Sequence, residues 1–197
     1  MTRIGARYIK WAPFHETDPE QDNAYPRYGT PDQLAELCAV SDTPNYAEAK
    51  LYGDGDVVEY VKEFVDADLN VEVTSLTGTQ GKNLLGLESL DTDDVGYGED
   101  NAPYGGLAFV TCEIRRGSKK YNAVYYPKVK FSATGMEYNT KNDTITFATG
   151  KLTGKAFGCK KVAGKSIWKV EPQESFTDLD DAEAWVDAKI AAYTVNP

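Results

Sequence analysis

Residues that could carry out chemistry are few and scattered in this chain. His15 is the only histidine, and the three cysteines, Cys38, Cys112 and Cys159, are far apart in the sequence with no Cys-x-x-Cys pair. A catalytic base needs partners that hold and orient it, a nucleophile needs an adjacent base, and zinc sites are built from closely spaced Cys and His residues. The sequence therefore predicts no catalytic residues, no metal site and no cofactor, and the protein is not expected to be an enzyme.

Two short motifs imitate ligand-binding loops. Residues 91–96 begin like an EF-hand calcium loop, but Val95 occupies its fifth position and Ala102 its twelfth, where a bidentate Glu is required. Adventitious calcium binding by Asp91, Asp93, Glu99 and Asp100 stays open. Residues 76–83 resemble a phosphate loop, yet Leu76 replaces its first glycine and Asn83 its magnesium-binding Ser or Thr, so this motif is rejected.

The charge balance narrows the partners of the protein. The 197 residues include 31 acidic and 21 basic ones, a net charge of -10, and this opposes binding to the nucleic acid backbone. Residues 1–11 lack the apolar region of a secretory signal, and no stretch approaches the roughly 20 apolar residues that span a bilayer. We expect a protein that stays in a reducing aqueous compartment, without membrane insertion. The length favours a single domain, residues 1–197, in which the proline-rich residues 13–33 form an extended arm or loop.

The most regular pattern lies between residues 44 and 76. From Val65 to Val73 the odd positions are apolar and the even ones polar, mostly acidic, and this period of two indicates a half-buried strand. Before it, the strand-like residues 46–52 and 57–62 flank Gly53-Asp54-Gly55-Asp56. An Asp-Gly pair between two such runs predicts a hairpin.

The remaining elements predict a mainly β (α+β) fold. Strands are expected at residues 107–115, at 120–133 with Pro127 marking an edge or bulge, and at 143–149, 151–157 and 166–170. A short helix is expected at residues 77–87, ending near Gly86, followed by an acidic glycine-rich loop at 89–106. Residues 177–192 predict a C-terminal amphipathic helix with Thr177 as its N-cap, because Leu179, Ala182, Val186 and Ile190 recur at helical spacing.

The order of several motifs resembles a known family. Tyr28-Gly29-Thr30-Pro31, residues 43–54 and Glu59 with residues 69–73 are similar to the major tail proteins of long-tailed, non-contractile bacteriophages. In the second half Ala102-Pro103-Tyr104, residues 128–131, 143–147 and 152–154 continue the likeness, which covers roughly residues 7–168. The proline-rich residues 18–26 and the helix after Thr177 depart from the family pattern.

The resemblance implies a tail tube protein. Two antiparallel sheets would pack as a sandwich or barrel with a flanking helix, and homo-hexameric rings would stack into a hollow tube in the virion, assembled in the bacterial host cytoplasm. Its partners would be copies of itself and other tail proteins at the tube ends, while DNA passes through the lumen without specific binding. Edge strands that otherwise invite aggregation would become the assembly surface.

The resemblance also assigns residues to these contacts. The hairpin of residues 50–64 would reach the adjacent ring, and its contact residues would be Lys50, Leu51, Tyr52, Gly53, Asp54, Gly55, Asp56, Val57, Val58, Glu59 and Tyr60. The polar face of the following strand would line the lumen and repel passing DNA, through Asp66, Asp68, Asn70 and Glu72. The alternative reading of these four residues is a face that merely contacts solvent.

A different class of function stays open beside this one. The chain contains 13 Tyr and 3 Trp residues, which could offer stacking faces for sugars in a free carbohydrate-binding or adhesin-like β-sandwich module. Such a module would be monomeric in solution, whereas a tube protein would form rings or polymers.

Overall fold

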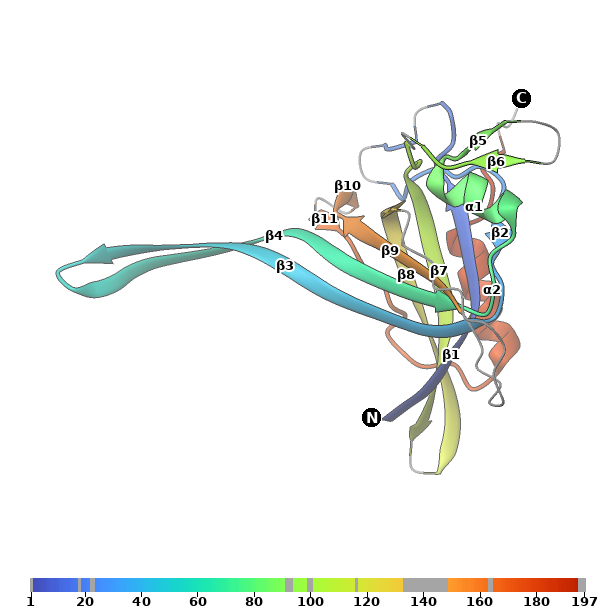
Figure 1. Ribbon diagram of the computed structural model, residues 1–197. Coiled ribbons are helices and arrows are strands. Elements are labelled where there is room, and N and C mark those ends of the chain that lie inside the picture. The colour runs from blue at the N-terminus through green and yellow to red at the C-terminus, as the bar shows by residue number, and fades with distance from the viewer. Residues whose placement is uncertain are drawn as a thin grey trace, which may run out of the picture.

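The chain folds around one large antiparallel sheet. The computed structural model describes residues 2–17, 19–21, 24–90, 94–98, 101–115, 117–132, 149–162 and 165–194. Within them seven strands pair in the order β2-β1-β7-β8-β9-β4-β3 (Figure 1). Their bounds are β1 (Thr2–Pro13), β2 (Asp32–Gln33), β3 (Leu37–Gly53), β4 (Asp56–Val73), β7 (Gly105–Arg115), β8 (Ser118–Ser132) and β9 (Gly150–Phe157). The prediction of a mainly β protein is confirmed.

The large sheet is continuous, whereas the family resemblance implied two antiparallel sheets packed as a sandwich or barrel. It bends so that β1, β7 and β8 face β4 and β9 across one core, which contains Trp11, Phe109, Leu69 and Leu152. The bend accompanies a bulge in β8: Tyr126 pairs with Leu107 and Val129 with Gly105, so two residues of β8 oppose one of β7. From Val129 onward β8 pairs with β9 along its other edge. Bulges bend strands in this way, and the prediction that Pro127 marks one is confirmed.

A second core lies on the outer face of β7 and β8. There α2 (Leu179–Lys189) packs Ala182 and Val186 against the sheet, with Ile190 just beyond its end, as the helical spacing predicted. The N-cap is Asp178, whose carboxylate accepts a hydrogen bond from the Asp180 amide. The prediction of Thr177 as the cap is wrong by one residue, because either residue type can cap and spacing alone does not choose between neighbours.

The short helix α1 (Gly78–Leu85) forms as the sequence predicted. Thr77 and Gln80 make a reciprocal capping box at its start. At its end Gly86 adopts a φ of 69°, a left-handed conformation that suits glycine. Because Leu84 and Leu85 are buried in the first core, the helix is held by packing and not by its glycine-weakened propensity.

A buried tyrosine, Tyr28, helps to anchor the described part of the proline-rich segment. The Tyr28 hydroxyl lies 2.5 Å from that of Tyr125 and donates a hydrogen bond of 2.6 Å to the carbonyl oxygen of Pro127. The Tyr28 hydroxyl hydrogen is used for Pro127, so Tyr125 must donate to Tyr28. Both side chains are buried, so this pair fixes the loop to the sheet at the β8 bulge.

Other elements were less well predicted. The strand β1 was not predicted, and the expected strand at 166–170 is the shorter β11 (Lys165–Ile167), which pairs with β10 (Cys159–Val162). A further two-stranded sheet joins β5 (Glu88–Ser89) and β6 (Val95–Gly96) inside the predicted loop. The strand predicted at residues 143–149 lies outside the described residues except for Thr149, as do Asp91, Asp93, Glu99 and Asp100.

Neither helix of the described chain has the length and apolar character needed to cross a membrane. The same residues contain no group of three or more His, Cys, Asp or Glu side chains that could hold a metal ion.

Candidate assembly surface

A two-stranded arm projects from the body of the protein. It is the outer part of the hairpin formed by β3 and β4, and it extends away from the rest of the sheet (Figure 1). Strand β9 pairs with β4 only from Asp66 to Val73, so beyond Asp66 the two hairpin strands pair with each other alone. We call residues 46–64 the arm; all the residues that the sequence assigned to the inter-ring contact, Lys50 to Tyr60, lie in its outer part.

The arm ends in the turn that the sequence predicted. Gly53 pairs with Asp56, and Asp54 and Gly55 have φ angles of 53° and 93°. Positive φ at both central residues is the requirement of a type I′ turn, whose twist matches that of a hairpin. The Asp-Gly dipeptide therefore fixes the register of the arm from its tip.

A bulge at Val65 separates the arm from the body. Asn45 pairs with Asp66 and Tyr46 with Phe64, so Val65 has no partner on β3. The extra residue reverses the alternation: Ala67, Leu69, Val71 and Val73 are buried, whereas Val65 is 55% exposed. The prediction that Val65 joins this apolar face is therefore wrong, and Phe64 turns toward the core in its place.

Large apolar side chains gather on the arm and its base. Those exposed by more than a third are Tyr46, Leu51, Tyr52, Val57, Val58, Tyr60, Val61 and Val65. They lie on both faces of a ribbon that has no layer packed against it. An isolated two-stranded hairpin is marginally stable in water, and a contiguous exposed apolar surface marks a site of interaction.

One face of the arm also carries paired charges. Lys62 forms an ion pair of 2.8 Å with Glu48 on the opposite strand, and its ammonium lies 4.4 Å from the centre of the Tyr46 ring. Lys50 lies 5.8 Å from the centre of the Tyr60 ring. These cross-strand contacts hold the two strands in register, although each exposed pair contributes little free energy.

An aromatic stack supports the base of the arm. The rings of Phe64 and Trp168 lie 5.0 Å apart with an interplanar angle of 12°, and Trp168 also contacts Tyr126 on β8. The next residue, Lys169, pairs with Asp42 on β3 at 2.9 Å. The segment after β11 therefore joins the base of the arm to the body, and nothing in the local sequence indicated this role for Trp168.

The face of β4 opposite the core carries the four residues predicted to line a lumen. Asp66 and Asp68 both accept hydrogen bonds from Asn45 and both form ion pairs with Lys155 on β9, at 2.8 Å and 3.1 Å. Lys155 and then Asn45 lower the pKa of Asp66, and Asn45 and then Lys155 lower that of Asp68. The two carboxylates stay ionised, but one cation offsets part of their charge.

Asn70 and Glu72 lie further along the same face. Glu72 accepts a hydrogen bond from the Thr149 hydroxyl, and Asn70 is exposed. Both line a shallow hollow of about 320 Å³ with Lys151 and Thr153 of β9. The described part of this face therefore mixes acidic and basic side chains, whereas the β4 sequence alone showed only acids.

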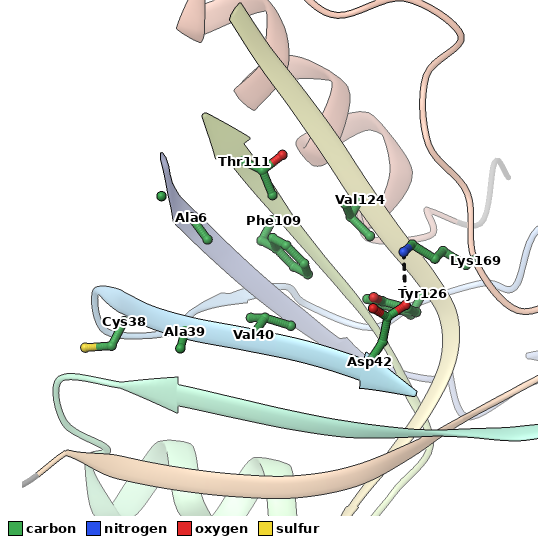
Figure 2. A pocket seen from close by; sticks show the side chains of 11 residues that line it. Ala6, Cys38, Ala39, Val40, Asp42, Phe109, Thr111, Val124, Tyr126 and Lys169 are labelled. Carbon is green, nitrogen blue, oxygen red and sulfur yellow. Dashed lines mark hydrogen bonds and ion pairs between the residues drawn. The ribbon is translucent and has the colours of Figure 1, made fainter. Parts of the chain in front are cut away.

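The residues with the greatest chemical reactivity are not brought together. Cys38 is exposed, Cys112 is half-buried and Cys159 is buried, and the described contacts of the His15 side chain are with Thr17 and the Tyr193 ring. Cys38 lies at the rim of a pocket of about 230 Å³ between β1 and β3, where the Asp42–Lys169 ion pair lies at the other end (Figure 2). The remaining lining is mostly apolar, so this pocket has no nucleophile beside a base.

No protein-family model matches the chain, and a search of curated proteins found no similar sequence.

Proposed function

We propose that the protein is a structural subunit that assembles with copies of itself, and specifically that it is the tail tube protein of a long-tailed, non-contractile phage. The arm carries this proposal. Its apolar side chains have no partner layer in the monomer, and the motif order of the sequence resembles that tail protein family. The homo-hexameric rings, their stacking into a virion tube and the passage of DNA all belong to the proposal.

The energetics of the arm favour many repeated contacts. Complete burial of a Val or Leu side chain contributes about 1.5–3 kcal/mol, so burying the exposed half of eight such side chains contributes on the order of 6–12 kcal/mol. Association costs about 4–15 kcal/mol in lost freedom of motion. One arm contact is thus weak by itself, whereas a closed ring in which every copy makes several contacts is stable.

The proposed lumen is the face that bears Asp66, Asp68, Asn70 and Glu72. Asp66 and Asp68 share Lys155, so replacing them with lysine would disturb the fold as well as the charge. Asn70 is exposed, and no described contact of its side chain would be lost. Asn70→Lys should slow genome ejection through attraction of the phosphates, while the matched control Asn70→Asp should eject normally. Normal ejection by Asn70→Lys would contradict the lumen assignment.

The carbohydrate-binding alternative receives less support. Trp11 is buried, Trp168 stacks on Phe64, and Trp185 lies beneath the ammonium of Lys189 at 5.2 Å. A sugar-binding face needs an open aromatic ring, and all three tryptophan rings are engaged within the fold, so open rings are left only to tyrosines such as Tyr52 and Tyr97 among the described residues.

Electron microscopy and sedimentation of the purified protein test the proposal. The intact protein should form rings or tubes that grow with concentration. In the arm variant, residues 47–63 are replaced by Asn-Gly, so that the paired Tyr46 and Phe64 are joined by a two-residue turn without a change of register. This variant should stay as single subunits or isolated rings.

The double exchange Glu48→Lys with Lys62→Glu is the matched control, because it keeps the ion pair and the net charge. It should assemble like the intact protein. Long tubes formed by the shortened variant would contradict the role of the arm, and an intact protein that remains monomeric at every concentration would contradict the proposed function.

A further inference from the structure

A cationic and aromatic pocket lies between α2 and the proline-rich loop. It has a volume of about 340 Å³ and is lined by residues 25–28 and by residues 188, 189 and 191–194. Two of the lining side chains, Arg27 and Lys189, are basic, and none of the described lining residues is acidic. Pockets of about 300–1,000 Å³ hold compact ligand groups.

Both cations are held on aromatic rings. The guanidinium carbon of Arg27 lies 4.1 Å from the centre of the Tyr193 ring. The Lys189 ammonium lies 4.5 Å from the centre of the Tyr25 ring and 5.2 Å from that of Trp185. Ring contacts position a cation but do not neutralise it.

The two positive charges lack a carboxylate partner within the described chain. Both side chains are half-buried, and burial lowers the pKa of Lys189. Placing like charges in partly desolvated surroundings costs free energy unless an anion joins them. The protein as a whole carries a net charge of -10, so two basic side chains gathered in one pocket stand out from the rest of the chain. They indicate that the occupant of the pocket is an anion.

The tip of the arm has the matching chemistry. The arm contains five acidic and two basic residues, and Asp54 and Asp56 are exposed at its turn with no ion pair described. Gly53 precedes Asp54 and Gly55 lies between the two aspartates, so these two positions add no side chain to the turn. Tyr52 and Val57, next to the turn, are more than half exposed and can pack on the aromatic wall of a pocket.

The arm and the pocket lie on opposite sides of the molecule. The arm extends to the left in Figure 1, whereas α2 lies on the right of the body. The tip of one copy therefore cannot enter its own pocket. A contact between two different patches is heterologous, and such contacts generate rings or filaments.

We propose, building on the self-assembly proposed above, that the pocket of Tyr25, Arg27, Lys189 and Tyr193 receives the acidic arm tip, Gly53 to Asp56, of a second copy of this chain. Asp54 and Asp56 supply the two carboxylates that Arg27 and Lys189 lack. The apolar residues beside the turn cover the aromatic wall. The pocket is thereby assigned as the receptor for the arm, and the pairing of two carboxylates with two cations gives the contact its specificity.

Two complementary variants test the contact in the full-length chain. The pocket variant is Arg27→Glu with Lys189→Glu. The tip variant is Asp54→Asn with Asp56→Lys, because Asn tolerates the positive φ at position 54. Each variant alone should associate roughly 30-fold or more weakly than the intact protein, as expected for breaking a desolvated charge pair.

An equal mixture provides the decisive measurement. The intact arm of the pocket variant can enter the intact pocket of the tip variant, so species containing both should form where neither variant alone associates. Sedimentation velocity with one variant fluorescently labelled detects them. The control Lys119→Glu with Lys165→Glu changes two exposed lysines outside the pocket and should assemble normally.

The outcomes separate this assignment from the proposed function. If the tip variant does not associate but the pocket variant assembles normally, the pocket is not the receptor for the arm, and the proposal of self-assembly is unaffected. Loss of association by both variants without recovery in the mixture also overturns it. Monomeric behaviour of the intact protein overturns both proposals. Near-UV circular dichroism checks folding, and Arg27→Gln with Lys189→Met replaces the pocket variant if that protein fails to fold.

Discussion

The buried pair Tyr28 and Tyr125 allows a sharp prediction about stability. Tyr28→Phe removes the hydroxyl that donates to the Pro127 carbonyl and accepts from Tyr125. Two buried polar groups then lose their partners, at about 1–3 kcal/mol each, so the free energy of unfolding should fall by roughly 2–6 kcal/mol. Tyr125→Phe removes one donor and leaves the Tyr28 hydrogen bonded to Pro127, and should cost only about 0.5–1.5 kcal/mol.

The double variant gives the deciding comparison. With both hydroxyls absent, only the Pro127 carbonyl is unsatisfied, so the double variant should be more stable than Tyr28→Phe alone. Urea unfolding measures the free energies. In thermal scans each kcal/mol corresponds to about 2–4 °C in a chain of this size. All measurements belong in the protein with the shortened arm, since the proposed assembly would raise the apparent stability.

A single result would refute this reasoning. If Tyr125→Phe is as costly as Tyr28→Phe, the hydroxyl of Tyr28 does not connect the other two groups, and the direction of the hydrogen bonds deduced here is wrong.

Three further predictions concern ionisation and the base of the arm. Burial raises the pKa of both Tyr28 and Tyr125. Their contribution to stability is therefore complete below the ordinary tyrosine pKa of about 10 and is lost as the pH rises above it. In the double Phe variant the free energy of unfolding should fall less steeply with rising alkaline pH, and an unchanged dependence would contradict this. Trp168→Ala removes the half-buried stack on Phe64 and should cost roughly 2–3 kcal/mol while amide exchange at residues 45, 46, 64 and 66 becomes faster; unchanged exchange would show that Trp168 does not support the arm. Lys155→Gln should raise the pKa of Asp66, measured by NMR titration against the control Lys151→Gln, toward the ordinary value for Asp; if that pKa stays low, Asn45 alone accounts for it.

The sequence predicted those features that depend on local chemistry. The Asp54-Gly55 turn, the end of α1 near Gly86 and the apolar spacing of α2 each need only neighbouring residues, and each appears in the structure. The alternation at residues 67–73 also predicted the buried face correctly, because its period is the period of the strand.

Bulges explain the main failures. In β1 the pairing shifts between Arg7 and Lys10, and Tyr8 has a φ of 54°, so the alternation that would have revealed this strand is interrupted. The prediction for Val65 was wrong for the same reason. Val65 is apolar and continues the alternation of residues 67–73, so the sequence gives no sign that it is the extra residue of a bulge.

The candidate site was predicted only in part. The arm followed from a local turn, but Lys155, Trp168 and the pocket around Lys189 depend on segments about 90 to 160 residues apart in the chain. The local sequence pattern of β4 gives no information on which distant lysine lies beside its acidic residues.

The Val65 bulge gives one strand two independent alternation patterns. Between the bulge and the end of β4, the odd residues 67–73 fill the core. Between the bulge and the arm tip, the even residues, beginning with Phe64, continue the same face of the strand. Changes in length beyond the bulge therefore leave the packing of the body untouched. Adding two residues to each strand would extend the reach of the arm by about 7 Å with the same faces preserved. In the proposed assembly, insertion within the arm would change the spacing between neighbouring copies while the rest of the protein keeps its fold.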